Sequence, residues 1–149
     1  MEWEEIKTAF DWDGSWRDLY VFETTTDDWQ RLVDFVRKSV HPHTFQRGPE
    51  VCALPAHVNV LFEKDAGALL SIRLGGITLN AHFFCDEQIE LDLDPREVHS
   101  EERAKALFEF MCGVGQVLRK PMRLTPENLS DYVLFEYDPV TDTLRRGRP

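Results

Sequence analysis

Seven polar residues in the middle of the chain are the first candidates for chemistry, because the sequence pattern places them on one face of a predicted sheet. They are Glu63, Arg73, Asn80, His82, Glu90, Asp92 and Asp94. Imidazole and carboxylate groups act as general acids and bases, and they also ligate divalent metals, so His82 beside Glu90 and Asp92 is the sharpest chemical candidate. An antiparallel sheet with one solvated face shows the same alternation without any such role. The pattern therefore leaves a solvated face, a partner-binding face and a catalytic site as alternatives.

A second group of residues has the side-chain types that zinc prefers. It consists of His41, His43, Cys52 and His57, within a proline-rich stretch. Imidazole nitrogen and thiolate sulfur suit tetrahedral zinc, but this spacing matches no zinc-finger pattern. We therefore predict no metal and no other cofactor, and keep these four residues only as weak candidates.

Motifs for nucleophilic or phosphate chemistry are missing from the sequence. There is no GxSxG elbow, and the neighbours Asp86 and Glu87 would raise rather than lower the pKa of a thiol at Cys85. The segment 113–115 (Gly-Val-Gly) lacks GK[ST] and lies inside a predicted helix, so it more reasonably lets another element approach closely. Whether the protein is an enzyme stays open, with the balance against it.

The elements that position the seven polar residues begin with a predicted antiparallel meander of four strands, about 58–93. Apolar residues alternate with period two there, and turn signals at 65–67, 75–76 and 85–87 divide the stretch. A slip of one residue would move a strand's apolar set to the other face, which fixes the register. It pairs Val60 with Ile72, Ile72 with Leu79, and Ala81 with Leu91, and all three hairpins share one apolar face. Leu61 and Leu69 interrupt the polar face, which predicts a partial cover by the chain's own N-terminal segment or by another protein.

Two amphipathic helices, about 26–40 and 96–119, can cover the apolar face. The first has a capping-box-like start at 25–28 and apolar residues stepping by three and four. The second can start at Asp94-Pro95 or at Ser100. Further strands are predicted near 19–23 and 132–137, a long irregular loop over 41–56, and a short helical turn at Thr125. The fold class is α+β, with the two helices packed on one face of the sheet.

Length and charge bound the remaining choices. The 149 residues suit a single domain, and 27 acidic against 17 basic residues give a net charge of −10. Such a surface repels phosphate backbones and anionic head groups, so we expect neither nucleic acid nor membrane as a partner. Three scattered cysteines without a CxxC pair fit free thiols in a reducing compartment, which predicts a cytoplasmic protein.

These observations favour a non-enzymatic, protein-binding domain with a basic protein partner. An acidic inhibitor resembling immunity proteins is its most specific form, on the analogy of charge and size. The alternative is a small metal-dependent hydrolase or a small-molecule-binding domain that uses the polar sheet face. A homodimer formed through the sheet edge or the polar face is a third alternative.

Overall fold

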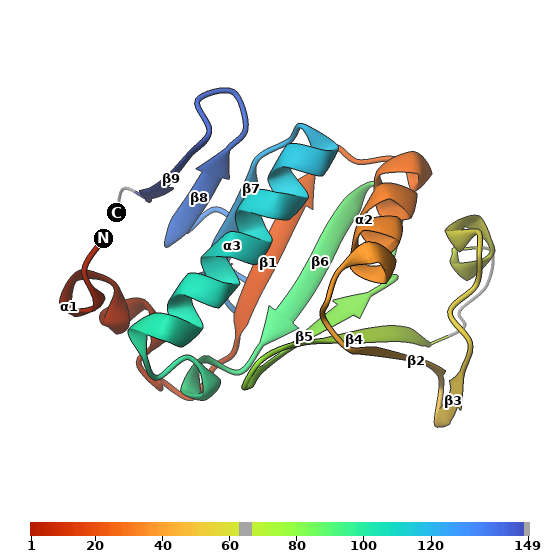
Figure 1. The fold of residues 1–149 in the computed structure, drawn as a ribbon, viewed down its shortest axis with the longest axis horizontal. Coiled ribbons are helices and arrows are strands. Elements are labelled where there is room, and N and C mark those ends of the chain that lie inside the picture. The colour runs from red at the N-terminus through yellow and green to blue at the C-terminus, as the bar shows by residue number, and fades with distance from the viewer. Residues whose placement is uncertain (63–66, 148–149) are drawn as a thin grey trace.

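The computed structural model describes residues 1–62 and 67–147 and confirms an α+β fold with an antiparallel meander. Its nine strands form one antiparallel sheet in the order β3-β2-β4-β5-β6-β1-β7-β8-β9 (Figure 1). The strands are β1 (Arg17–Phe22), β2 (His43–Arg47), β3 (Glu50–Cys52), β4 (Ala68–Leu74), β5 (Ile77–His82), β6 (Gln88–Leu93), β7 (Met122–Pro126), β8 (Phe135–Asp138) and β9 (Thr143–Arg146).

The two long helices, α2 (Thr26–Lys38) and α3 (Glu101–Leu118), lie side by side over one face of this sheet (Figure 1). Shorter helical segments complete the layer: α1 (Trp3–Ile6), η1 (Lys7–Phe10), η2 (Val58–Leu61) and η3 (Pro95–Glu97). None of the helices in the described residues is both long and apolar enough to cross a membrane.

The predicted strand register is confirmed at the centre of the meander. Ile72 faces Leu79 across β4 and β5, and Ala81 faces Leu91 across β5 and β6. These four side chains are fully buried against the helices. The alternation of apolar residues was therefore sufficient to align these strands, because a one-residue slip would have exposed the whole set.

The predicted first strand of the meander, beginning at 58, is wrong. Residues Val58–Leu61 form the helical turn η2, and β4 pairs with β2 instead. Val58 and Leu61 are both buried, and their spacing of three places them on one face of a helical turn, whereas a strand would turn them to opposite faces. The alternation of Val58, Val60 and Phe62 predicted the strand, but Val60 is exposed. The side chain of Gln30 in α2 accepts a hydrogen bond from the Val58 amide at 2.9 Å, which holds η2 against the helix layer.

The irregular loop predicted over 41–56 is also wrong in part. It contains the hairpin of β2 and β3, which turns at Gly48 with a positive φ of 55°. Phe45 is the only residue of this hairpin that is fully buried. One buried residue among the eight residues of two strands gives no periodicity to detect.

Two strands in the C-terminal third differ from prediction as well. The helical turn predicted at Thr125 is part of strand β7, which pairs with β1, and the strand predicted at 132–137 begins at Phe135. Strand β1 therefore lies inside the sheet between β6 and β7. Its burial on both faces leaves Asp18 and Tyr20 as little exposed as Leu19.

The helices begin at the predicted caps and end slightly early. Thr25 and Asp28 form the capping box of α2, which ends at Lys38 instead of residue 40. Ser100 caps α3 by accepting a hydrogen bond from the Arg103 amide, whereas Asp94 caps the separate turn η3. The predicted helix 96–119 is therefore a 3₁₀ turn followed by an α-helix that begins at Glu101.

Glycines let α3 approach both neighbours, as the sequence predicted for the segment 113–115. A Cβ atom added to Gly113 would lie 2.8 Å from the Phe35 ring on α2. One added to Gly115 would lie within 2.3 Å of the buried Tyr137 ring on β8. The absence of side chains at these two positions sets how closely α3 packs on the sheet and on α2.

Replacing Gly115 with alanine tests this close approach, because helix propensity and packing predict changes of opposite sign in the free energy of unfolding. Propensity alone favours alanine by about 1 kcal/mol, whereas forcing a methyl group into the Tyr137 ring costs about 1–3 kcal/mol. We expect Gly115→Ala to lower the free energy of unfolding in urea denaturation. The exposed control Glu109→Ala on the same helix should change it by less than about 0.5 kcal/mol. A stabilised Gly115→Ala protein would contradict the close approach.

Candidate functional site

The candidate site lies on the sheet face opposite the helices, where β5, β6 and β1 adjoin. The register brings Asn80 opposite Asp92, Asp92 opposite Asp18, and Glu90 opposite Tyr20. The alternation that buries Leu91 and Leu19 on the helix side turns these polar residues to the other side. Two of them, Asp18 and Tyr20, come from β1, far from the meander in sequence.

Tyr20 joins two carboxyl groups at the centre of the site. Its hydroxyl group lies 3.0 Å from Asp18 Oδ2 and 3.1 Å from Glu90 Oε1. The backbone amide of Asn128, which follows β7, also donates to Asp18 Oδ2 at 2.8 Å. A tyrosine hydroxyl has one proton, so it donates to one carboxylate at a time. Protonating the other carboxyl group would satisfy this arrangement.

A second chain of hydrogen bonds runs across the sheet beside the first. Ser71 donates to Asn80 Oδ1 at 3.1 Å, and Asn80 Nδ2 donates to Asp92 Oδ1 at 3.1 Å. The other oxygen of Asp92 lies 2.7 Å from His82 Nε2. The carboxylate of Asp92 is thus held on both oxygens, and it fixes the imidazole of His82.

Four of the groups described above, Asp18, His82, Glu90 and Asp92, line a concavity of about 440 Å³ together with two aromatic residues. Its lining consists of Trp16, Asp18, His82, Phe84, Glu90, Asp92, Glu127 and Asn128, which we call the acidic pocket. The Phe84 ring stacks parallel on the His82 imidazole, with ring centroids 5.1 Å apart. Phe84 is nevertheless 72% exposed, so a large apolar surface stands open beside buried carboxyl groups.

The environment of the acidic pocket disfavours the charged forms of two of its carboxyl groups, those of Asp18 and Glu90. Burial raises the pKa of Asp18 and also that of Glu90. The hydrogen bonds that each carboxylate accepts only partly offset this rise. Burial and the two neighbouring carboxylates raise the pKa of Tyr20 above its ordinary value. The hydrogen bond to Asp92 raises the pKa of His82, because the imidazole N–H donates to the carboxylate. Negative charges in this part-buried site cost solvation free energy, because burial removes water from the carboxylates.

No lysine or arginine within the described part of the chain forms an ion pair with Asp18, Glu90 or Asp92. Among the described residues that line the pocket, the only basic side chain is His82, which carries a charge only when it is protonated. A cation from outside the chain would therefore meet carboxylates that the fold leaves uncompensated.

The structure brings only some of the seven predicted site residues together. Asn80, His82, Glu90 and Asp92 form the site described above. Asp94 instead caps η3 and pairs with Arg96 at 2.9 Å, and the exposed Arg73 side chain lies opposite Thr78 on the neighbouring strand. Glu63 lies outside the described residues.

The four weak zinc candidates are spread over separate elements. His43 is on β2, Cys52 on β3, and His57 precedes η2, while the His41 ring packs 6.5 Å from the Phe110 ring. In the parts of the chain that are described, no three His, Cys, Asp or Glu side chains are placed so that they could hold a metal ion.

Sequence reasoning missed five of the eight residues that line the acidic pocket: Trp16, Asp18, Phe84, Glu127 and Asn128. Asp18, Glu127 and Asn128 could not be placed, and neither could Tyr20 beside them, because the position of β1 between β6 and β7 depends on pairings between distant segments. Phe84 could have been assigned to this face, since it follows His82 with period two.

The predicted cover by the N-terminal segment is wrong for most of the polar face. Ile6 and Phe10 pack into the core on the helix side, and Leu61 is in η2, also in the core. Of residues 1–16, only Trp16 lines the acidic pocket.

The chain matches no protein-family model, no curated protein and no solved structure. Inference about its function therefore depends on the geometry of the site.

Changing Asp92 to asparagine tests the hydrogen bond that raises the pKa of His82. We expect Asp92→Asn to lower the His82 pKa toward the ordinary value of about 6.5, as measured by NMR titration of the imidazole. In the wild type, the stabilisation from this pair is complete below about pH 6.5 and is lost as pH rises through the raised pKa. The control Asp94→Asn, which has no contact with His82, should leave the titration unchanged. An unaltered His82 pKa in Asp92→Asn would contradict the assigned pairing.

Proposed function

We propose that this chain is a non-enzymatic, protein-binding domain whose acidic pocket receives a cationic side chain of a basic protein partner. Its most specific form is an acidic inhibitor resembling immunity proteins. The single observation that supports it is the group of part-buried carboxyl groups in the acidic pocket, which have no lysine or arginine partner among the described residues. An arriving ammonium or guanidinium group would restore the balance of charge there.

The aromatic walls support recognition of a side chain. Phe84 and Trp16 flank the carboxyl groups, and a guanidinium or ammonium group gains a further attraction from the face of an aromatic ring within about 6 Å. Exposed aromatic residues next to a desolvated polar centre are typical of the residues that dominate binding energy in protein interfaces. The net charge of −10 would raise the rate of encounter with a basic partner.

The hydrogen bonds within the site also support binding, because they hold its carboxylates in place before a partner arrives. Asp92 is held by Asn80 and His82, and Asp18 by Tyr20 and Asn128, so the carboxylates are pre-positioned. Free thiols at the exposed Cys52 and Cys85 support a reducing, cytoplasmic setting for the encounter.

A second candidate is binding of a small organic cation in the same pocket. Its volume of about 440 Å³ lies within the range of roughly 300–1,000 Å³ typical of small-molecule sites. Calorimetry with arginine amide and spermidine separates the candidates, because tight binding of either compound alone would favour a small ligand over a protein.

Affinity capture from the native host tests the protein-binding proposal. Immobilised wild-type protein should retain a basic protein in stoichiometric amount at about 0.15 M salt, and 1 M salt should release it, because screening weakens exposed charge pairs. Phe84→Ala and Glu90→Gln should each reduce the amount retained by at least tenfold.

Matched variants outside the pocket serve as controls for this capture. Glu50→Gln removes a carboxylate from the exposed edge strand β3, and Val140→Ala removes exposed apolar surface from the turn between β8 and β9. Both should retain the partner as the wild type does. No stoichiometric partner, a partner indifferent to 1 M salt, or equal retention by Phe84→Ala and Val140→Ala would each refute the proposal.

A further inference from the structure

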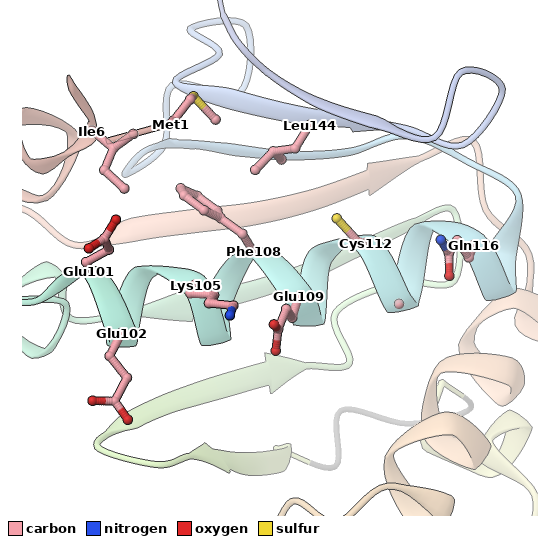
Figure 2. Close-up of a pocket in the computed structure, with 11 residues that line it drawn as sticks. Met1, Ile6, Glu101, Glu102, Lys105, Phe108, Glu109, Cys112, Gln116 and Leu144 are labelled. Atoms are coloured by element: carbon pink, nitrogen blue, oxygen red, sulfur yellow. The ribbon is translucent and has the colours of Figure 1, made fainter. Parts of the chain in front are cut away.

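A groove runs along α3 on the other side of the sheet, away from the acidic pocket. It has a volume of about 930 Å³ and lies between α3, the N-terminal segment and β9. Its floor is apolar and includes Met1, Ile6, Phe108, Cys112 and Leu144. Figure 2 shows Phe108 and Cys112 on α3 extending toward the side where Leu144 of β9 lies. We call this feature the α3 groove.

The α3 groove occupies the place where a further helix would lie in the helix layer. Helices pack about 8–10 Å apart and strands about 4.8 Å apart, so one helix covers about two strands. Helix α3 covers β7 and β8, and Gly115 lets it rest on Tyr137. Leu144, opposite Tyr137 on β9, faces the same side and is only half-buried. The sheet thus extends one strand beyond its helical cover.

The rim of the α3 groove is acidic. Glu101, Glu102 and Glu109 project from α3, and Lys105 is the only basic side chain among the described residues that line the groove. In Figure 2, Glu101 extends toward Ile6, whereas Glu102 and Glu109 lie on the side of the helix away from Leu144. An apolar floor with an acidic rim is complementary to an amphipathic element with an apolar face and basic flanks.

The same charges argue against a second copy of this chain in the groove. A two-fold contact would place the glutamates of one copy near those of the other, and each copy has a net charge of −10. Like charges brought together at an interface cost binding energy. The occupant must come from a protein of opposite charge.

We propose that the α3 groove docks a cationic amphipathic helix of a partner protein. The groove extends from Glu101 to Gln116 along α3, which at 1.5 Å per residue is about 22 Å. A helix of about 15 residues, with leucine-like residues at helical spacing and lysine or arginine beside them, matches this length and chemistry. This surface is separate from the acidic pocket and does not depend on the function proposed for it.

A synthetic leucine–lysine peptide of about 15 residues, patterned as an amphipathic helix, is the probe for this proposal. We expect amide chemical-shift changes in a titration of the labelled protein to concentrate on α3, β9 and residues 1–6. Fluorescence anisotropy of a labelled peptide supplies the dissociation constant. A peptide of the same composition in scrambled order, and a leucine–glutamate peptide in the original order, should each bind at least tenfold more weakly.

Charge-reversing variants locate the acidic rim. We expect the double variant Glu102→Arg, Glu109→Arg to weaken peptide binding at least tenfold, while Glu50→Arg on the distant strand β3 changes it less than twofold. Leu144→Gln tests the apolar floor and should weaken peptide binding. If circular dichroism shows that Leu144→Gln does not fold, Cys112→Asn is the replacement variant.

Three results would overturn the proposal. Shift changes centred on the acidic pocket would show that the peptide binds elsewhere. Equal binding of the scrambled peptide would show that charge attracts the peptide and that no apolar groove recognises its helical pattern. Equal weakening by Glu50→Arg and by the double variant would show that net charge alone is responsible.

Discussion

The structure depends on the alternation of buried apolar and outward-facing polar side chains along its central strands. In β4, β5 and β6, alternate side chains are fully buried beneath α2 and α3, and antiparallel pairing aligns them across the sheet. Burial of this set is the main favourable free energy, at roughly 25 cal/mol per Å² of apolar surface. Because the side-chain period is two, the same alternation must turn the polar set outward. The acidic pocket is therefore a consequence of how the core is built.

What could be predicted from the sequence follows from this constraint. The pairing of Ile72 with Leu79 and of Ala81 with Leu91 was predictable, and with it the proximity of His82 to Asp92. The caps at Thr25 and Ser100 were also readable, because side-chain capping is a local property.

The remainder could not be predicted because it depends on distant contacts. Strand β1 pairs with β6 and β7 on either side, which brings Asp18 into the acidic pocket and the Tyr20 hydroxyl against Asp18 and Glu90. In β2 too few residues are buried for any period to appear, while Val58, Val60 and Phe62 alternate like a strand although Val58–Leu61 form η2, so β4 was assigned the wrong partner. Local patterns determine elements and registers, whereas strand order is decided by the whole chain.

The acidic pocket also illustrates a conflict between stability and function. Asp18 and Glu90 are placed where burial disfavours their charged forms, and the described residues supply no lysine or arginine to compensate. A fold selected for stability alone would have a neutral residue in such a position. The α3 groove, in contrast, leaves apolar surface open without placing charge inside the protein.

The free energy of unfolding of Glu90→Gln tests the central claim that the pocket holds uncompensated charge. Because the folded-state pKa of Glu90 is raised, the cost of its ionised form grows as pH rises from the unfolded-state pKa to the folded-state pKa, and protonation removes the cost at low pH. Glu90→Gln should thus be more stable than the wild type at pH 7.5 in urea denaturation. The difference should shrink as pH falls through the raised pKa of Glu90 and be absent below about pH 4.3. Glu50→Gln should show no such pH-dependent gain. A Glu90→Gln protein less stable than the wild type at pH 7.5 would mean that the chain itself compensates this charge, and the account would be wrong.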